Sequence, residues 1–126
     1  MCGICGFVDR QHGGAQASLE ATVEAMALTL VRRGPDSSGV WADASAGVAF
    51  GHRRLAIVDL SAAGHQPMQS ACGRYWLTYN GEVYNFADLR KELRTAGVTF
   101  TGDSDTEVIV NGCARWGVTE LTRRLN

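Results

Sequence analysis

SGVWADASAGVAFGHRRLAIVDL, the stretch from residue 38 to residue 60, contains strand-like segments that follow one another closely. We expect strands at residues 38–42, 47–51 and 55–60. A further short strand is expected near the N-terminus, over residues 4–9. Residues 75–84 alternate aromatic and aliphatic side chains around Asn80-Gly81, which is the strongest short sequence signal for a β-hairpin.

Helices are expected on both sides of this strand-rich stretch. After a loop at residues 10–16, residues 18–31 form an amphipathic helix that Ser18 caps. This helix ends by Arg33-Gly34-Pro35, because glycine and proline oppose its continuation. Further helices are expected at residues 86–96 (ended by Gly97), 105–116 and 118–125. The mixture of strands and separate helices predicts an α+β fold with largely antiparallel sheets.

Composition is typical of a soluble globular protein. The chain has 126 residues, enough for one domain, of which 45% are hydrophobic and 20% are charged. A net charge of −1 lacks the basic excess of a nucleic-acid binder. No apolar run approaches the ~18 residues of a membrane span, and Met1 leads into Cys2 without the regions of a signal peptide. We therefore expect a cytoplasmic protein with reduced thiols and with neither nucleic acid nor a membrane as partner.

The C-terminal end of the sequence follows a predicted helix directly, at Asn126. The strands expected above are too few to complete a two-sheet core. We therefore expect the N-terminal portion of a longer protein. An unfinished sheet leaves an unpaired edge, which favours aggregation and could leave the isolated portion inactive.

Cys2 is a candidate nucleophile, because removal of Met1 would make it the N-terminal residue. Its own α-amino group could then accept the thiol proton, so that one residue supplies both nucleophile and base. Two other interpretations stay open: a small buried apolar residue, or one half of a redox or metal pair with Cys5. A zinc site normally needs a second pair at short spacing, whereas Cys72 and Cys113 are far apart in the sequence.

Two further pairs of residues fit either a structural or a catalytic role. Asn80-Gly81 can be a simple turn, or an oxyanion hole made by the Asn80 amide and the Gly81 backbone N–H. Arg53-Arg54 can be a solvated face of a strand, or one of the two arginines can hold a substrate carboxylate through two hydrogen bonds.

Acidic residues and histidines complete the set of candidates. Glu82 and Asp105 are either surface charges, with Asp105 as a helix N-cap, or acceptors for a substrate ammonium group. His52 and His65 are expected to stabilise loops, since no spacing of further ligands supports a metal site. Taken together, a nucleophile, an oxyanion pair, a carboxylate clamp and ammonium acceptors describe a site for a free α-amino acid. The side-chain carbonyl of glutamine would then face the thiol.

Six motifs, in order along the chain, resemble those of one known family. They are MCGICGF (1–7), RGPD (33–36), GHRRLAIVDL (51–60), GHQPM (64–68), YNGEVYN (79–85) and SDTEVI (104–109). Across residues 1–126 the chain resembles the N-terminal class II glutamine amidotransferase domain of glutamine-hydrolysing asparagine synthetases. This domain is an N-terminal nucleophile hydrolase. Arg32 is a departure, since the family commonly has histidine there. The resemblance implies an αββα sandwich with largely antiparallel sheets, incomplete at its C-terminus.

The resemblance also implies roles for individual residues. The nucleophile falls on Cys2, and the oxyanion donors fall on Asn80 and Gly81. The implied glutamine-binding positions are Arg54 for the carboxylate, Leu55, Ile57 and Val58 beside it, and Glu82 and Asp105 for the α-amino group. No metal ligand is implied within residues 1–126.

The implied reaction is attack of the Cys2 thiolate on the glutamine amide, release of ammonia and hydrolysis of the thioester to glutamate. Ammonia would then pass to a C-terminal synthetase domain, absent from this sequence, where ATP and Mg²⁺ activate aspartate for conversion to asparagine. The 126 residues have no phosphate-binding loop, and we expect no cofactor in them. A homodimer is one option for the full-length enzyme.

Two alternatives stay open. One is the glutaminase domain of a related amidotransferase with another acceptor. The other, from a different class, is a non-catalytic metal or redox module that uses Cys2 and Cys5.

Overall fold

A computed structural model describes residues 1–11, 14–56 and 62–126. The chain divides into two compact units. Unit 1 comprises the described residues of Met1–Ala56, His65–Pro67 and Thr78–Asn80, and unit 2 comprises those of Ile57–Gly64, Met68–Leu77 and Gly81–Asn126. Strands pair in antiparallel fashion in both units and helices occur in both, so the predicted α+β class is confirmed.

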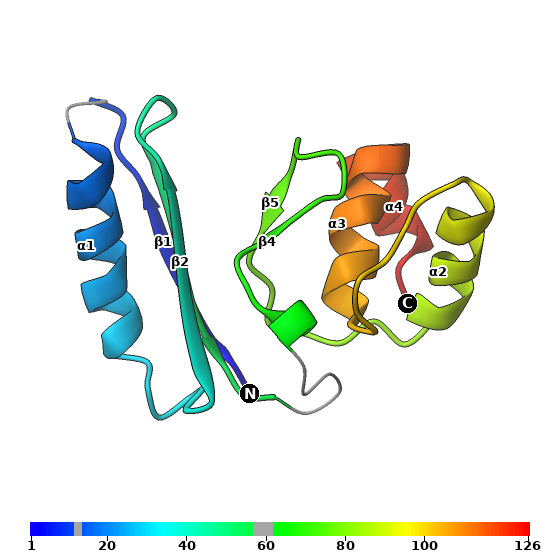
Figure 1. The fold of residues 1–126 in the computed structure, drawn as a ribbon, viewed down its shortest axis with the longest axis horizontal. Coiled ribbons are helices and arrows are strands. Elements are labelled where there is room, and N and C mark those ends of the chain that lie inside the picture. Colours follow the sequence, from blue (N-terminus) through cyan, green and yellow to red (C-terminus); the bar gives the residue numbers. More distant parts are fainter. Residues whose placement is uncertain (12–13, 57–61) are drawn as a thin grey trace. The chain divides into compact units, whose positions relative to one another are not determined.

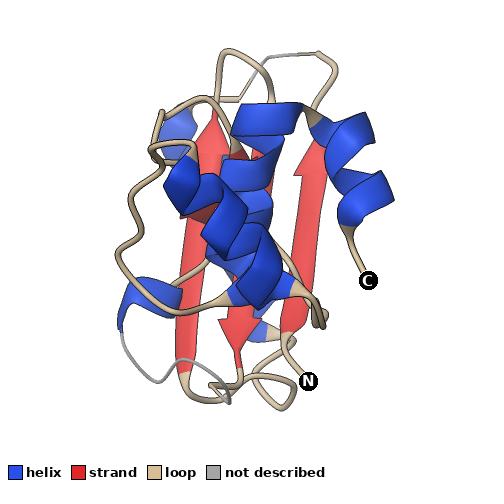
Figure 2. Cartoon of the chain, turned by 90° about the vertical axis from the view of Figure 1, so that its right-hand side faces the viewer, coloured by secondary structure: helices blue, strands red, loops and turns tan. Residues whose placement is uncertain are grey.

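Unit 1 is built on a three-stranded antiparallel sheet with the order β1-β3-β2. Its strands are β1 (Gly3–Val8), β2 (Ser37–Asp43) and β3 (Val48–Arg54). The strands run side by side as long arrows (Figure 2). The register pairs Gly3 with Arg53, so the N-terminus of the chain lies beside the end of β3.

Helix α1 (Gln16–Leu28) covers one face of this sheet (Figure 1). Leu19 and Val23 of the helix form a buried apolar cluster with Ala42 and Ala49 of the strands. A side chain at Gly51 would lie 3.2 Å from Val23 and 3.3 Å from Ala27, so glycine lets the helix approach the sheet closely. Burial of these side chains supplies the main stabilisation of the unit.

Unit 2 is mainly helical. It contains the short strands β4 (Met68–Gln69) and β5 (Trp76–Leu77), the 3-10 turn η1 (Ala62–Gly64) and the helices α2 (Phe86–Thr95), α3 (Asp105–Trp116) and α4 (Val118–Arg124). Helix α3 contacts α2, α4 and both short strands. Its side chains Val108 and Val110 are buried, as are Leu93 of α2 and Leu121 of α4. Among the described residues, no helix has both the length and the apolar character to cross a membrane.

Several expected elements occur close to their predicted bounds. The strands at residues 4–9, 38–42 and 47–51 and the last three helices are confirmed. Gly97, which was predicted to end helix α2, follows this helix with φ of +87°. This backbone conformation favours glycine and ends helices.

The predicted caps were wrong. Helix α1 begins two residues earlier than expected, with Ala15 as N-cap, and Ser18 lies inside the helix, where its carbonyl accepts a hydrogen bond from Thr22. Helix α3 is capped by Ser104, whose hydroxyl accepts the backbone N–H of Glu107 at 3.2 Å. Asp105 is therefore the first residue of the helix and not its cap.

The predicted hairpin around Asn80-Gly81 was also wrong, because its backbone groups bond elsewhere. The N–H of Tyr79 donates to the side chain of Gln66 at 2.6 Å, and the N–H of Val83 donates to Asp105 at 3.0 Å. Strand β5 pairs instead with β4. The expected strand at residues 55–60 is not present at residues 55–56, and residues 57–60 lie outside the described part of the chain.

Candidate active site

Cys2 lies one residue before β1 and is held against the end of β3. The backbone N–H of Leu55 donates to the Cys2 sulfur at 3.3 Å, and the thiol lies 3.6 Å from the Leu55 carbonyl oxygen. The register of β1 on β3 explains this contact, because it pairs Gly3 with Arg53 and so carries Cys2 toward Arg54 and Leu55. The sheet thus fixes the position of the sulfur.

Asn80 is brought to the same place from far along the sequence. Its side-chain amide donates to the carbonyl oxygen of Cys2 at 2.9 Å. Arg54 ends β3, and Leu55 follows it. Unit 1 therefore gathers four of the predicted site residues, which are Cys2, Arg54, Leu55 and Asn80.

The Arg33-Gly34-Pro35-Asp36 loop supports the segment that carries Arg54. The guanidinium of Arg53 donates to the Gly34 carbonyl at 3.0 Å, and the N–H of Asp36 donates to the Arg54 carbonyl at 3.0 Å. The Asp36 carboxylate in turn accepts the N–H of Ala56 at 2.8 Å. Arg53 and the backbone of Arg54 are thus both bound to this loop.

His52 was expected to stabilise a loop, and it does so from within β3. Its Nδ1 lies 3.1 Å from the Thr78 hydroxyl, two residues before Asn80. Burial, together with the nearby His65 and Arg54, lowers the pKa of His52 to about 4, so the ring is neutral at neutral pH. Among the described residues, Nε2 of this ring has no hydrogen-bond partner although it is buried.

Gly81, Glu82 and Asp105 belong to unit 2. Gly81 follows Asn80 directly, and the side chain of Glu82 is exposed. The Asp105 carboxylate accepts the N–H of Val83, so Asp105 is linked to the residue that follows Glu82. Ile57 and Val58, the remaining predicted positions, lie outside the described residues.

Two buried charged residues that sequence reasoning missed hold the loop before Asp105. Glu107 accepts hydrogen bonds from the N–H of Thr101 at 2.7 Å and from that of Gly102 at 3.0 Å. Arg90 of α2 donates to the carbonyls of Gly102 at 2.6 Å and Ser104 at 3.1 Å. The Ser-Asp-Thr-Glu spacing is that of a helix capping box and could have identified the Ser104–Glu107 pair.

Cys5 was the suggested partner of Cys2 in a redox or metal pair. Cys5 lies on β1 and packs against α1, with its sulfur 3.9 Å from the Val23 carbonyl oxygen, and burial raises the pKa of the thiol. Among residues 1–11, 14–56 and 62–126, no group of three or more His, Cys, Asp or Glu side chains could hold a metal ion.

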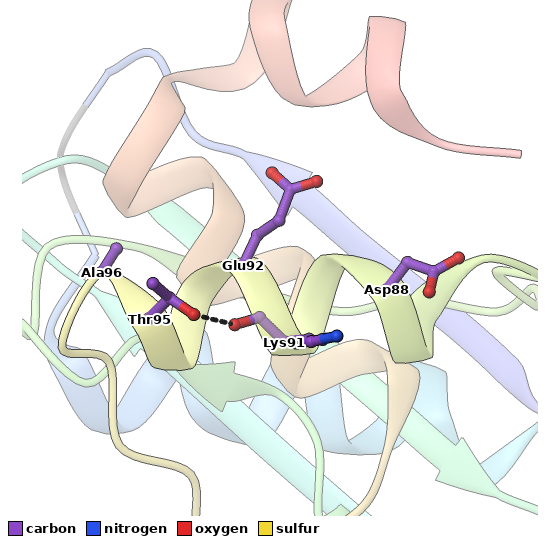
Figure 3. Close-up of a pocket in the computed structure, with 5 residues that line it drawn as sticks. All are labelled: Asp88, Lys91, Glu92, Thr95 and Ala96. Carbon is purple, nitrogen blue, oxygen red and sulfur yellow. Dashed lines mark hydrogen bonds between the residues drawn. The ribbon is translucent and has the colours of Figure 1, made fainter.

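A shallow depression of about 560 Å³ lies on α2, lined by Asp88, Lys91, Glu92, Thr95 and Ala96 (Figure 3). The Thr95 hydroxyl donates to the Lys91 carbonyl at 3.0 Å, so this hydroxyl is used within the helix. None of the predicted site residues lines the depression.

Comparisons with known proteins show the family to which this chain is similar. Residues 1–126 match the family model described as a glutamine amidotransferase domain. An asparagine synthetase (glutamine-hydrolyzing) 3 of Bacillus subtilis is 47% identical over an alignment of 120 residues, gaps included, that covers 92% of this chain and 18% of the relative. A putative asparagine synthetase (glutamine-hydrolyzing) of Mycobacterium tuberculosis is 45% identical over 136 residues, covering 99% of this chain and 21% of the relative.

A more distant relative, amidase chry2 of Gibberella zeae, is 31% identical over 130 residues, covering 97% of this chain and 19% of the relative. The chain thus spans about a fifth of the length of these relatives. The match of the family model to all 126 residues shows that the chain belongs to the glutamine amidotransferase domain family.

Proposed function

We propose that this chain is the glutaminase portion of an asparagine synthetase, in which Cys2 attacks the side-chain amide of glutamine. The observation that carries the proposal is the hydrogen bond between the Asn80 amide and the Cys2 carbonyl. It joins a candidate nucleophile to a candidate oxyanion donor that is remote in the sequence. Relatives named asparagine synthetase (glutamine-hydrolyzing) at 45–47% identity support the same conclusion.

Removal of Met1, whose side chain is exposed, would free the α-amino group of Cys2. This amine takes the thiol proton as the sulfur bonds to the glutamine side-chain carbon. The carbonyl oxygen becomes negative and accepts hydrogen bonds from the Asn80 amide and the Gly81 N–H. Collapse of this intermediate breaks the C–N bond, and the nitrogen takes the proton and leaves as ammonia. Water then hydrolyses the thioester to glutamate and regenerates the thiol.

Recognition of glutamine is assigned to the remaining predicted site residues. Arg54 would bind the α-carboxylate, because a guanidinium matches a carboxylate with two parallel hydrogen bonds. Leu55, Ile57 and Val58 would supply backbone contacts beside it. Glu82 and Asp105 would accept hydrogen bonds from the α-ammonium group, and the link from Asp105 to Val83 supports their acting together.

The wider reaction would belong to further domains like those of the longer relatives. Ammonia would pass to a synthetase domain in which ATP and Mg²⁺ activate aspartate, and the two sheets of an αββα sandwich would be completed by further strands. The full-length enzyme would act in the cytoplasm, with a homodimer as one option. A second candidate, a glutaminase that supplies another acceptor, is favoured by the similarity to amidase chry2.

The test combines intact mass with a glutaminase assay, on the protein in its full natural length. We expect loss of Met1, a single adduct on Cys2 from a glutamine-mimicking electrophile, and loss of glutamine hydrolysis in Cys2→Ala. Synthesis from added ammonia should survive in that variant. Cys72→Ala is the matched control, because this cysteine is exposed and lies outside the site. Glutaminase activity that persists in Cys2→Ala, or retention of Met1 in an active enzyme, would refute the mechanism.

A further inference from the structure

We propose that His52 is a positioning residue of this glutaminase, which holds the Asn80 amide in place through Thr78. The inference rests on the proposed function and adds a residue to it. Among the described residues, the His52 side chain makes no hydrogen bond to Cys2 or to the proposed glutamine-binding residues.

The segment Thr78–Asn80 has no regular secondary structure, so it needs other bonds to fix its place. Each of its residues is anchored by a contact within unit 1. The Thr78 hydroxyl lies 3.1 Å from Nδ1 of His52, and the Tyr79 N–H donates to Gln66 at 2.6 Å. Asn80 then donates to the Cys2 carbonyl. The anchors of Thr78 and Tyr79 therefore determine where the Asn80 amide lies.

The accuracy of this placement matters for catalysis. A donor stabilises an oxyanion only within a hydrogen-bond distance of about 2.7–3.1 Å, and an error of about 1 Å can cost on the order of 10²-fold in rate. The Asn80 amide nitrogen carries two hydrogens, and the bond to the Cys2 carbonyl uses one of them. The second can serve the oxyanion if the segment holds the side chain beside Cys2.

Stability alone does not explain a histidine at position 52. The side chain is only 1% exposed, and Nε2 has no partner among the described residues. A buried polar atom without a partner costs about 1–3 kcal/mol, which an apolar side chain in β3 would avoid. The bond from Nδ1 to Thr78 is therefore the contact for which the ring is needed.

The decisive experiment is a mutant cycle on glutamine hydrolysis in the full-length protein. We expect His52→Leu to lower kcat about 10- to 100-fold and to leave KM for glutamine within about 2-fold. In an Asn80→Ala background the same substitution should change kcat by less than about 2-fold, because no amide remains to be positioned. A merely structural role would lower activity by the same factor in both backgrounds, and that result would overturn the proposal.

Conservative variants keep the test decisive if His52→Leu folds poorly. His52→Asn places a hydrogen-bonding atom near the position of Nδ1, so we expect kcat to recover to within about 5-fold of the wild type. Thr78→Val, which keeps the side-chain shape and removes the hydroxyl, should reproduce the loss of kcat seen in His52→Leu. His65→Asn is the matched control, since this exposed histidine makes none of the hydrogen bonds that hold the segment among the described residues. Full activity of Thr78→Val would also overturn the proposal.

The outcomes separate this inference from the proposed function. If the wild-type protein does not hydrolyse glutamine, or if Cys2→Ala still does, the proposed function fails and this inference fails with it. If hydrolysis depends on Cys2 but the losses of His52→Leu and Asn80→Ala multiply, only the role of His52 is refuted.

Discussion

Replacement of Glu107 by glutamine should loosen the loop that leads into Asp105. One carboxylate oxygen of Glu107 accepts the Thr101 N–H at 2.7 Å and the Thr101 hydroxyl at 3.0 Å, and the other accepts the Gly102 N–H at 3.0 Å. Glutamine has the same shape but only one acceptor oxygen. If that oxygen serves Thr101, an NH₂ group faces the Gly102 N–H, and two donors oppose each other.

The magnitude follows from these three bonds. A hydrogen bond to a charged group contributes about 1.5–3 kcal/mol and a neutral one about 0.5–1.5 kcal/mol, so the two retained bonds lose about 1 kcal/mol each. The unpaired N–H of Gly102 costs a further 1–3 kcal/mol or so. Removing a buried charge recovers part of its desolvation cost. We therefore expect Glu107→Gln to lower local stability by about 2–4 kcal/mol.

Hydrogen exchange of the α3 backbone amides measures this local stability. A loss of about 2–4 kcal/mol corresponds to an exchange rate about 30- to 1000-fold faster in the variant. Glu20→Gln is the matched control, because Glu20 is partly exposed on α1 and, among the described residues, bonds only to the side chain of Gln16, at 2.7 Å. It should change exchange less than about 3-fold. An equally small effect of Glu107→Gln would refute the reasoning.

Two further perturbations test the support of the site. Gly34→Ala should destabilise unit 1 by about 1–3 kcal/mol and raise KM for glutamine. The new Cβ would collide with the Arg53 carbonyl and lie 2.6 Å from the Arg54 backbone nitrogen. An unchanged urea midpoint and an unchanged KM would contradict this prediction. Acid should also destabilise unit 1. The pKa of His52 falls from its ordinary value of 6.5 to about 4 on folding, so the stability from the neutral ring is complete above pH 6.5 and is lost as the pH falls toward 4. The loss is about 3 kcal/mol, and urea unfolding at several pH values should show it in the wild type but not in His52→Asn.

The sequence was most informative where the signal is local. The bounds predicted for α3 agree with the structure, and Gly97 marked the end of α2, because helix periodicity and glycine preference depend on neighbouring residues. The N-terminal strand was likewise predicted to within one residue at each end. The identities of Cys2, Asn80 and Asp105 as candidates also came from local motifs.

Local signals failed where a distant group took a hydrogen bond. Asn80-Gly81 favours a hairpin by itself, yet Gln66 and Asp105 bind the backbone N–H groups of Tyr79 and Val83. The hydrogen bonds of these two side chains stabilise the observed backbone more than the turn preference of Asn80-Gly81 stabilises a hairpin. Asp105 lost its predicted capping role for a similar reason, since Ser104 supplies the cap and frees the Asp105 carboxylate for Val83.

What the sequence determined by itself was the α+β class, the family and the set of candidate residues. Only the tertiary structure decided that Cys2, Leu55 and Asn80 share hydrogen bonds and that His52 contacts Thr78. The physical reason is that these contacts depend on strand register and on burial. The pairing of Gly3 with Arg53 places the start of β1 beside the end of β3, and no motif of neighbouring residues specifies it.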